Sequence, residues 1–214
     1  MQNYLEKNNR LASYFAVAYF GLTFYWVLAF WLNHDHSAVH DYISDLFVAS
    51  NPYSWLFRIL EVISGMVLCL AVYFSKTLYN VSKSSLILIK RSFMAIGIMI
   101  IFDGIVISNC TKSEILCGGT YLQDTLSILH ALESIIVASL MIWLGYYIYK
   151  KSTNYLKFFA VIFIILALGG LYHCYNFGDG PINGVVQRVF GFVFGVLVLL
   201  VFLNFSHKST KKIP

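Results

Sequence analysis

Charged residues are scarce in this sequence. Only 12% of the 214 residues are Asp, Glu, Lys or Arg, whereas 59% are hydrophobic and the mean hydropathy is +0.72. Because about 25% of the residues in a soluble globular protein are charged, this composition excludes that class. The net charge of +5 does not indicate a nucleic-acid partner, since positive charge in a membrane protein is more simply an orientation signal.

The sequence also lacks internal repeats, low-complexity segments and any linker long enough to separate domains, so we expect residues 1–214 to form a single domain. A cleavable signal peptide is not expected, because Lys7 and Arg10 lead directly into a full-length apolar run. The four cysteines include no C-x-x-C pair, which argues against a thiol oxidoreductase.

Six apolar runs are each long enough to cross the hydrocarbon core of a bilayer, which is about 30 Å thick and needs about 20 helical residues. The runs are continuously apolar rather than alternating, so helices are expected rather than the strands of a barrel. The sequence therefore predicts an all-α polytopic membrane protein. Its bundle of six transmembrane helices is expected at approximately residues 11–32, 53–75, 86–108, 125–149, 155–173 and 182–205.

Basic residues fall mainly on one side of this six-span topology. The two terminal segments, the even-numbered loops and the adjoining span ends hold twelve of the fifteen basic residues and one acidic residue, a net +11. The other side holds nine acidic and three basic residues, a net −6. The positive-inside rule then predicts a multi-pass protein of the plasma membrane with both termini in the cytoplasm.

Ionisable side chains interrupt the apolar runs near their outer ends. Asp103 lies near the end of the third run, His130 and Glu133 lie in the first turns of the fourth, and Arg188 lies about two turns into the sixth. At 1.5 Å per residue, all lie roughly 6–13 Å below the outer surface. Such groups are costly in lipid and mark a site or a partner. We predict that these four candidate catalytic residues converge in one outward-opening pocket, with Arg188 paired to Asp103 or Glu133.

Further polar residues are expected at or near the same depth in the bundle. Arg58 and Glu61, in the second run, are spaced i, i+3 and are close enough to pair on one helix face. Ser44 and Asp45 lie in the preceding outer loop, and Gln187 lies at the head of the sixth run. We regard these five as candidate binding residues.

Cys110 and Cys117 lie in an outer loop that faces an oxidising compartment. A disulfide between them is therefore expected, with free thiols as the alternative. Cys174, near the outer end of the fifth run, is a competing partner.

The first outer loop, residues 33–52, is rich in metal-ligand side chains. Zinc or nickel binding is one interpretation, but the spacing is not that of a closed structural site. A solvated acidic loop is the favoured interpretation, and whether the protein takes a divalent metal or any other cofactor stays open. The side chains are His34, His36, His40, Asp35, Asp41 and Asp45.

Short motifs mark several of the outer span ends. They are Ile43-Ser44-Asp45-Leu46, Asn51-Pro52 and Trp55-Leu56-Phe57, with His130 and the pair Gln187-Arg188 further on. This set resembles a family of prokaryotic six-helix membrane proteins labelled domain of unknown function 998, and the likeness covers nearly the whole chain. Phe47 stands where a small residue is expected. The resemblance implies a six-helix membrane fold and no established activity.

Three function classes remain open. The first is a hydrolase or transferase acting on a lipid at the outer leaflet, with His130 as general base or metal ligand, Asp103 and Glu133 as its acidic partners, and Arg188 as an oxyanion or phosphate clamp. The second is a non-enzymatic binding or assembly protein whose polar layer is structural. The third is a proton-coupled small-solute transporter, although the inner halves of the spans carry few polar groups. Lipid is the expected partner in each case, and the oligomeric state stays open.

Overall fold

The computed structural model describes residues 2–32, 43–48, 51–75, 83–106, 121–151, 155–177 and 183–207. Within these residues the chain is helical and contains no strand. The long helices are α1 (Gln2–Leu22), α3 (Ser54–Phe74), α4 (Lys83–Ile105), α5 (Tyr121–Lys151), α6 (Tyr155–Phe177) and α7 (Asn183–His207). The short ones are η1 (Tyr25–Leu28), α2 (Ala29–Leu32) and η2 (Ile43–Phe47).

Several of these helices have the length and composition of membrane spans, so the predicted all-α membrane fold is confirmed. Large apolar side chains such as Ile98, Ile135 and Ile165 point outward and are more than half exposed, as lipid contact requires. The described segments long and apolar enough to cross a membrane are Lys7–Leu32, Ser54–Phe74, Ser85–Ile105 and Gly184–Leu203, with a shorter apolar stretch at Leu156–Gly169.

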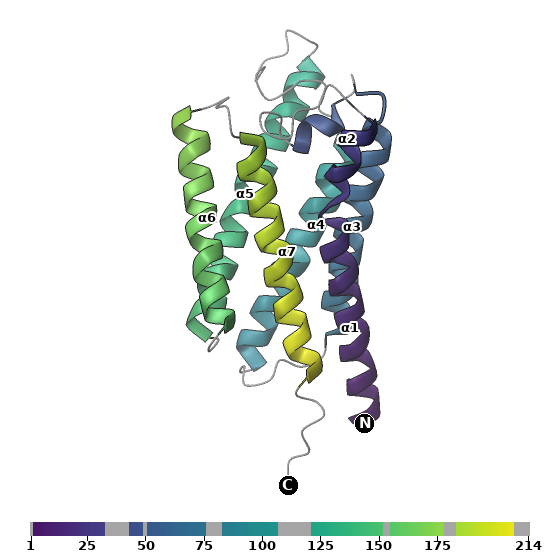
Figure 1. The fold of residues 1–214 in the computed structure, drawn as a ribbon, viewed down its shortest axis with the longest axis vertical. Helices are drawn as coiled ribbons and strands as arrows, with labels where there is room; N and C mark the ends of the chain where they lie inside the picture. Colours follow the sequence, from purple (N-terminus) through teal and green to yellow (C-terminus); the bar gives the residue numbers. More distant parts are fainter. Residues whose placement is uncertain are drawn as a thin grey trace.

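The six long helices form a closed ring in chain order. The main contacts join α1 to α3, α3 to α4, α4 to α5, α5 to α6, α6 to α7, and α7 back to α1. Figure 1 shows that the start of α1 and the end of α7 lie at the same end of the bundle, whereas α2 lies at the other. We call these the terminal end and the α2 end. An even number of passes through the bundle explains why the two ends of the chain meet on one side.

The first span is not one continuous helix. At Thr23 the backbone N–H is shared between Tyr19 O (3.0 Å) and Phe20 O (3.2 Å), and the Thr23 hydroxyl also donates to Phe20 O at 2.7 Å. The chain then continues as the 3₁₀ helix η1 before α2. A 3₁₀ turn advances about 120° per residue rather than about 100°, so Tyr25 lies closer to the face of Tyr19 than a continuous α-helix would allow.

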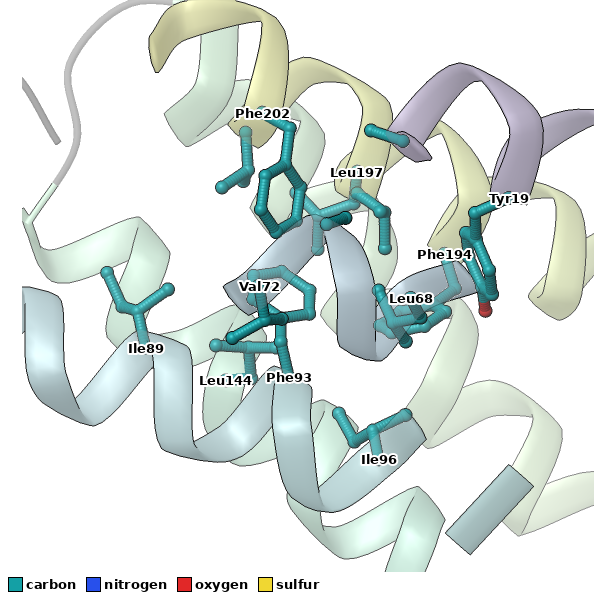
Figure 2. Packing of buried hydrophobic residues seen from close by; sticks show 14 of the residues in the cluster. Tyr19, Leu68, Val72, Ile89, Phe93, Ile96, Leu144, Phe194, Leu197 and Phe202 are labelled. Atoms are coloured by element: carbon teal, nitrogen blue, oxygen red, sulfur yellow. The ribbon is translucent and has the colours of Figure 1, made fainter. Parts of the chain in front are cut away.

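Aromatic rings fill the middle of the ring of helices. Phe194 of α7 contacts Phe93 of α4 (centroids 6.3 Å apart), Phe163 of α6 (5.6 Å) and Tyr19 of α1 (6.4 Å). Toward the terminal end the core continues with buried residues such as Phe202, as Figure 2 shows. The middle of the bundle is therefore packed with apolar rings, and toward the terminal end buried polar residues such as Asn9, Ser13 and Ser92 lie among the apolar ones.

Helices α3 and α4 approach each other closely through glycines. A Cβ built on Gly65 would lie 2.6 Å from Gly97 O, and one built on Gly104 would lie 2.9 Å from Arg58 O. Both distances are too short for any other residue without movement of a helix. This contact fixes the register in which α3 and α4 present their polar side chains to the interior.

Each of these two helices also caps the other. Arg58 of α3 donates to Gly104 O (3.0 Å) and Ile105 O (2.8 Å) at the end of α4. Lys90 of α4 donates to Ser75 O, the residue that follows α3. The last carbonyls of a helix have no partner within the helix, and a cation there also offsets the negative end of the helix dipole.

Candidate functional site

A cavity of about 230 Å³ occupies the centre of the bundle at the α2 end. It lies above the aromatic rings around Phe194, which form its floor. Among the described residues, the lining comes from α1, α3, α4, α5 and α7 and from both 3₁₀ helices. The residues are Tyr19, Thr23, Tyr25, Ile43, Phe47, Glu61, Ser64, Ile100, Asp103, Ser134, Val137, Ala138, Met141, Gln187, Phe190, Gly191 and Phe194.

Two carboxylates face this cavity, Glu61 from α3 and Asp103 from α4. They are close enough to interact electrostatically, and Glu61 also accepts a hydrogen bond from the Tyr25 hydroxyl. Glu61, Ser64 and Gly65 share one face of α3 at helical spacing, and Asp103 adjoins Gly104 on α4. The glycine contact between these helices therefore brings the two acids together.

Two hydroxyl groups face the same space. Ser64 is 4% exposed and Tyr19 is 3% exposed, and both line the cavity. Within the part of the chain that the structure describes, neither hydroxyl has a hydrogen-bond partner. Both hydroxyls border the cavity and can therefore form hydrogen bonds to water or to another polar group held there.

The 3₁₀ helix η2 covers the cavity at the α2 end. Ile43 and Phe47 line the cavity, and Phe47 is 4% exposed with its ring stacked on Tyr25 at 6.3 Å between centroids. Gln187 of α7 accepts a hydrogen bond from the Ile43 backbone N–H, and Asn51 donates to Leu46 O at 3.0 Å. Asn51 and Gln187, both from the short motifs, thus hold η2 in place over the cavity. The large side chain of Phe47 packs beneath η2 against Tyr25.

The two arginines near this level do not line the cavity. Arg58 binds the end of α4, so the Arg58–Glu61 pair suggested by their spacing does not form, and Glu61 binds Tyr25 instead. Arg188 is 6% exposed, with its guanidinium carbon 5.1 Å from the centroid of the Trp26 ring, a cation–π contact. Its pairing with Asp103 or Glu133 stays a prediction.

Among the predicted site residues, Asp103, Glu61 and Gln187 line one cavity, and Asp45 lies in η2 without lining it. The backbones of His130 and Glu133 belong to α5 and that of Ser44 to η2. The side chains of these three lie outside the described residues, as do all of Cys110, Cys117 and residues 33–42. Within the described part of the chain, no group of three metal-binding side chains occurs.

The sequence did not single out Tyr19 and Tyr25 as site residues. Tyrosines in apolar runs are common near membrane interfaces, so their hydroxyls carried no distinct signal. Tyr25 reaches Glu61 because the first span tightens into η1, and that tightening depends on packing against α3 and η2.

Fold and site together define a polytopic α-helical membrane protein with an acidic cavity inside its bundle. The chain belongs to the DUF998 family, described as proteins of unknown function, whose sequence model matches residues 16–204. The resemblance noted from its short motifs is thereby confirmed. No curated protein matches the chain, and no solved structure does.

Proposed function

We propose that this membrane protein binds the polar head of an amphiphilic molecule in the cavity at the α2 end. The observation that carries the proposal is the convergence of Glu61, Asp103 and the hydroxyls of Tyr19 and Ser64 on a cavity of about 230 Å³. This volume is roughly one and a half times that of a 150 Å³ engineered cavity that takes benzene, so a lipid headgroup fragment fits.

The alternative of a purely structural polar layer has less support. A structural layer is stable when every member is satisfied by a neighbour, whereas Tyr19 and Ser64 have no hydrogen-bond partner among the described residues. Transport of a solute also has less support. The packed rings of Phe194, Phe93 and Phe163 lie between the cavity and the terminal end.

A hydrolase or transferase that acts on the bound amphiphile is the second candidate. It is favoured by the neighbouring carboxylates Glu61 and Asp103, one of which accepts a hydrogen bond from a tyrosine. Such a pair can serve as general base and acid. His130 and Glu133 belong to the same proposed set through their place on α5, and Arg188 keeps the proposed role of clamp.

The side of the membrane is part of the proposal. The excess of basic residues at the terminal end supports cytoplasmic termini in the plasma membrane. The cavity then lies in the outer half of the membrane, beneath η2. A disulfide between Cys110 and Cys117 belongs to the same proposed side.

Filling the cavity tests the proposal. A Cβ on Gly191 would meet no atom within 4 Å, and Gly191 lines the cavity, so Gly191→Leu places a side chain in the binding space. Gly169→Leu is the matched control, because Gly169 is exposed on α6 and its Cβ also meets no atom within 4 Å. Native mass spectrometry should find a bound amphiphile on the wild type and on Gly169→Leu, and much less on Gly191→Leu. Equal occupancy in all three proteins would contradict the proposal.

A further inference from the structure

The charged residues among the described lining of the cavity are acidic. Among the described lining residues, Glu61 and Asp103 are acidic and none is basic, because Arg58 and Arg188 contact other groups. Acidic side chains on a cavity wall favour a cationic ligand over an anionic one.

The remaining polar groups suit a hydrogen-bond donor. The carboxylates accept hydrogen bonds, and the hydroxyls of Tyr19 and Ser64 can accept as well as donate. A primary ammonium group carries three donors and no acceptor. The two buried hydroxyls and the two acids together offer an acceptor for each of its N–H groups.

The apolar part of the lining fits the same ligand. The rings of Tyr19, Phe190 and Phe194 line the base of the cavity. Aromatic faces attract a cation through the ring quadrupole, and the attraction is larger where water is excluded. Gly191 leaves space beside these rings because it has no side chain.

We infer that the cavity recognises a primary ammonium group, carried by a lipid headgroup or by a free amine. The inference rests on the proposed function and names the ligand class of the same site. Glu61 and Asp103 attract the positive charge of the ammonium, Tyr19 and Ser64 accept its hydrogen bonds, and the aromatic floor contacts the methylene carbons next to it. A quaternary ammonium has no N–H donor, so it leaves both hydroxyls without partners and binds more weakly.

The inference is tested by measuring which headgroups the purified full chain binds in detergent. The lipid probes are phosphatidylethanolamine, its N-acetylated derivative, phosphatidylcholine and phosphatidylglycerol, and free ethanolamine is the soluble probe. We expect phosphatidylethanolamine to bind at least tenfold tighter than the other three lipids. If free ethanolamine binds as tightly as the lipid, the ligand is a soluble amine and the amphiphile of the proposed function is overturned; if only the lipid binds, the ligand is a headgroup. Either result supports the recognition of an ammonium group.

Substitutions at the lining residues identify which side chains produce the headgroup selectivity. Glu61→Gln with Asp103→Asn should abolish the preference for phosphatidylethanolamine over its N-acetylated derivative, while Glu6→Gln, in α1 near the terminal end, keeps it. Tyr19→Phe and Ser64→Ala should each lower the affinity for phosphatidylethanolamine several-fold and leave the N-acetylated lipid unaffected. These two provide the test if the double variant does not fold.

The outcomes separate the inference from the proposed function. If all lipids bind equally, or phosphatidylglycerol binds best, and binding is lost in Gly191→Leu, the ammonium inference is overturned and the proposed function stands. If no probe binds in a way that depends on Gly191, both are overturned.

Discussion

The glycine contact between α3 and α4 makes a graded stability prediction. Gly65→Ala adds a Cβ that would lie 2.6 Å from Gly97 O and 2.7 Å from Cγ1 of Ile101. A backbone oxygen cannot rotate away, so α3 and α4 must move apart. Gly97→Ala is milder, because its closest neighbour at 2.7 Å is the side-chain sulfur of Cys69, which can change rotamer. Gly169→Ala, with no atom within 4 Å, is the control.

The expected magnitudes follow from two opposing effects. Replacing a helical glycine with alanine favours the helix by about 1 kcal/mol, which is the result expected for Gly169→Ala. Overpacking a close contact costs about 1–3 kcal/mol. Gly65→Ala should therefore be about 1–3 kcal/mol less stable than Gly169→Ala, with Gly97→Ala between them.

Unfolding in mixed micelles of dodecyl maltoside and SDS, followed by circular dichroism, measures these free energies. Because Glu61 and Asp103 are presented by the same two helices, Gly65→Ala should also weaken ligand binding. A Gly65→Ala protein as stable as Gly169→Ala would show that α3 and α4 are not in close contact, and would refute the reasoning.

Three further predictions concern the ends of the bundle. Arg58→Met should lower the free energy of unfolding by about 1.5–3 kcal/mol, because it removes charged hydrogen bonds to the last carbonyls of α4; wild-type stability in the same unfolding assay would contradict this. A cysteine introduced at position 38 should react with an impermeant thiol reagent on intact cells and one at position 210 should not, and reversed labelling would place the termini outside. Mass spectrometry of a non-reduced digest should find Cys110 joined to Cys117, a closed loop worth roughly 2–3 kcal/mol, and finding both thiols free would contradict it.

The membrane fold and the depth of the site along the bundle could be predicted from sequence, because both follow from hydropathy. A carboxylate in an apolar run is costly wherever it lies, so the positions of Asp103 and Glu61 along their runs are enough to mark the α2 end. Gln187 is also marked by its place at the head of a span. These signals are local, and the helix that carries each residue fixes its depth.

The partners within the site could not be predicted, because they depend on tertiary packing. Local spacing suggested Arg58 for Glu61, but the close approach of α4 offers Arg58 two carbonyls and leaves Glu61 to Tyr25. The tightening of the first span into η1, which turns Tyr25 inward, has no distinct sequence pattern. The difference between α and 3₁₀ winding at one turn is too small in energy for local sequence to decide.

The most direct test of ammonium binding in the cavity is a crystal structure of the protein grown from a lipid phase that contains phosphatidylethanolamine. We expect density for a headgroup in the cavity, with its nitrogen between the carboxylates of Glu61 and Asp103 and within hydrogen-bond distance of the Tyr19 and Ser64 hydroxyls. A cavity closed by its own side chains, or one that holds only water while lipid binds elsewhere, would show that the cavity is not a headgroup site.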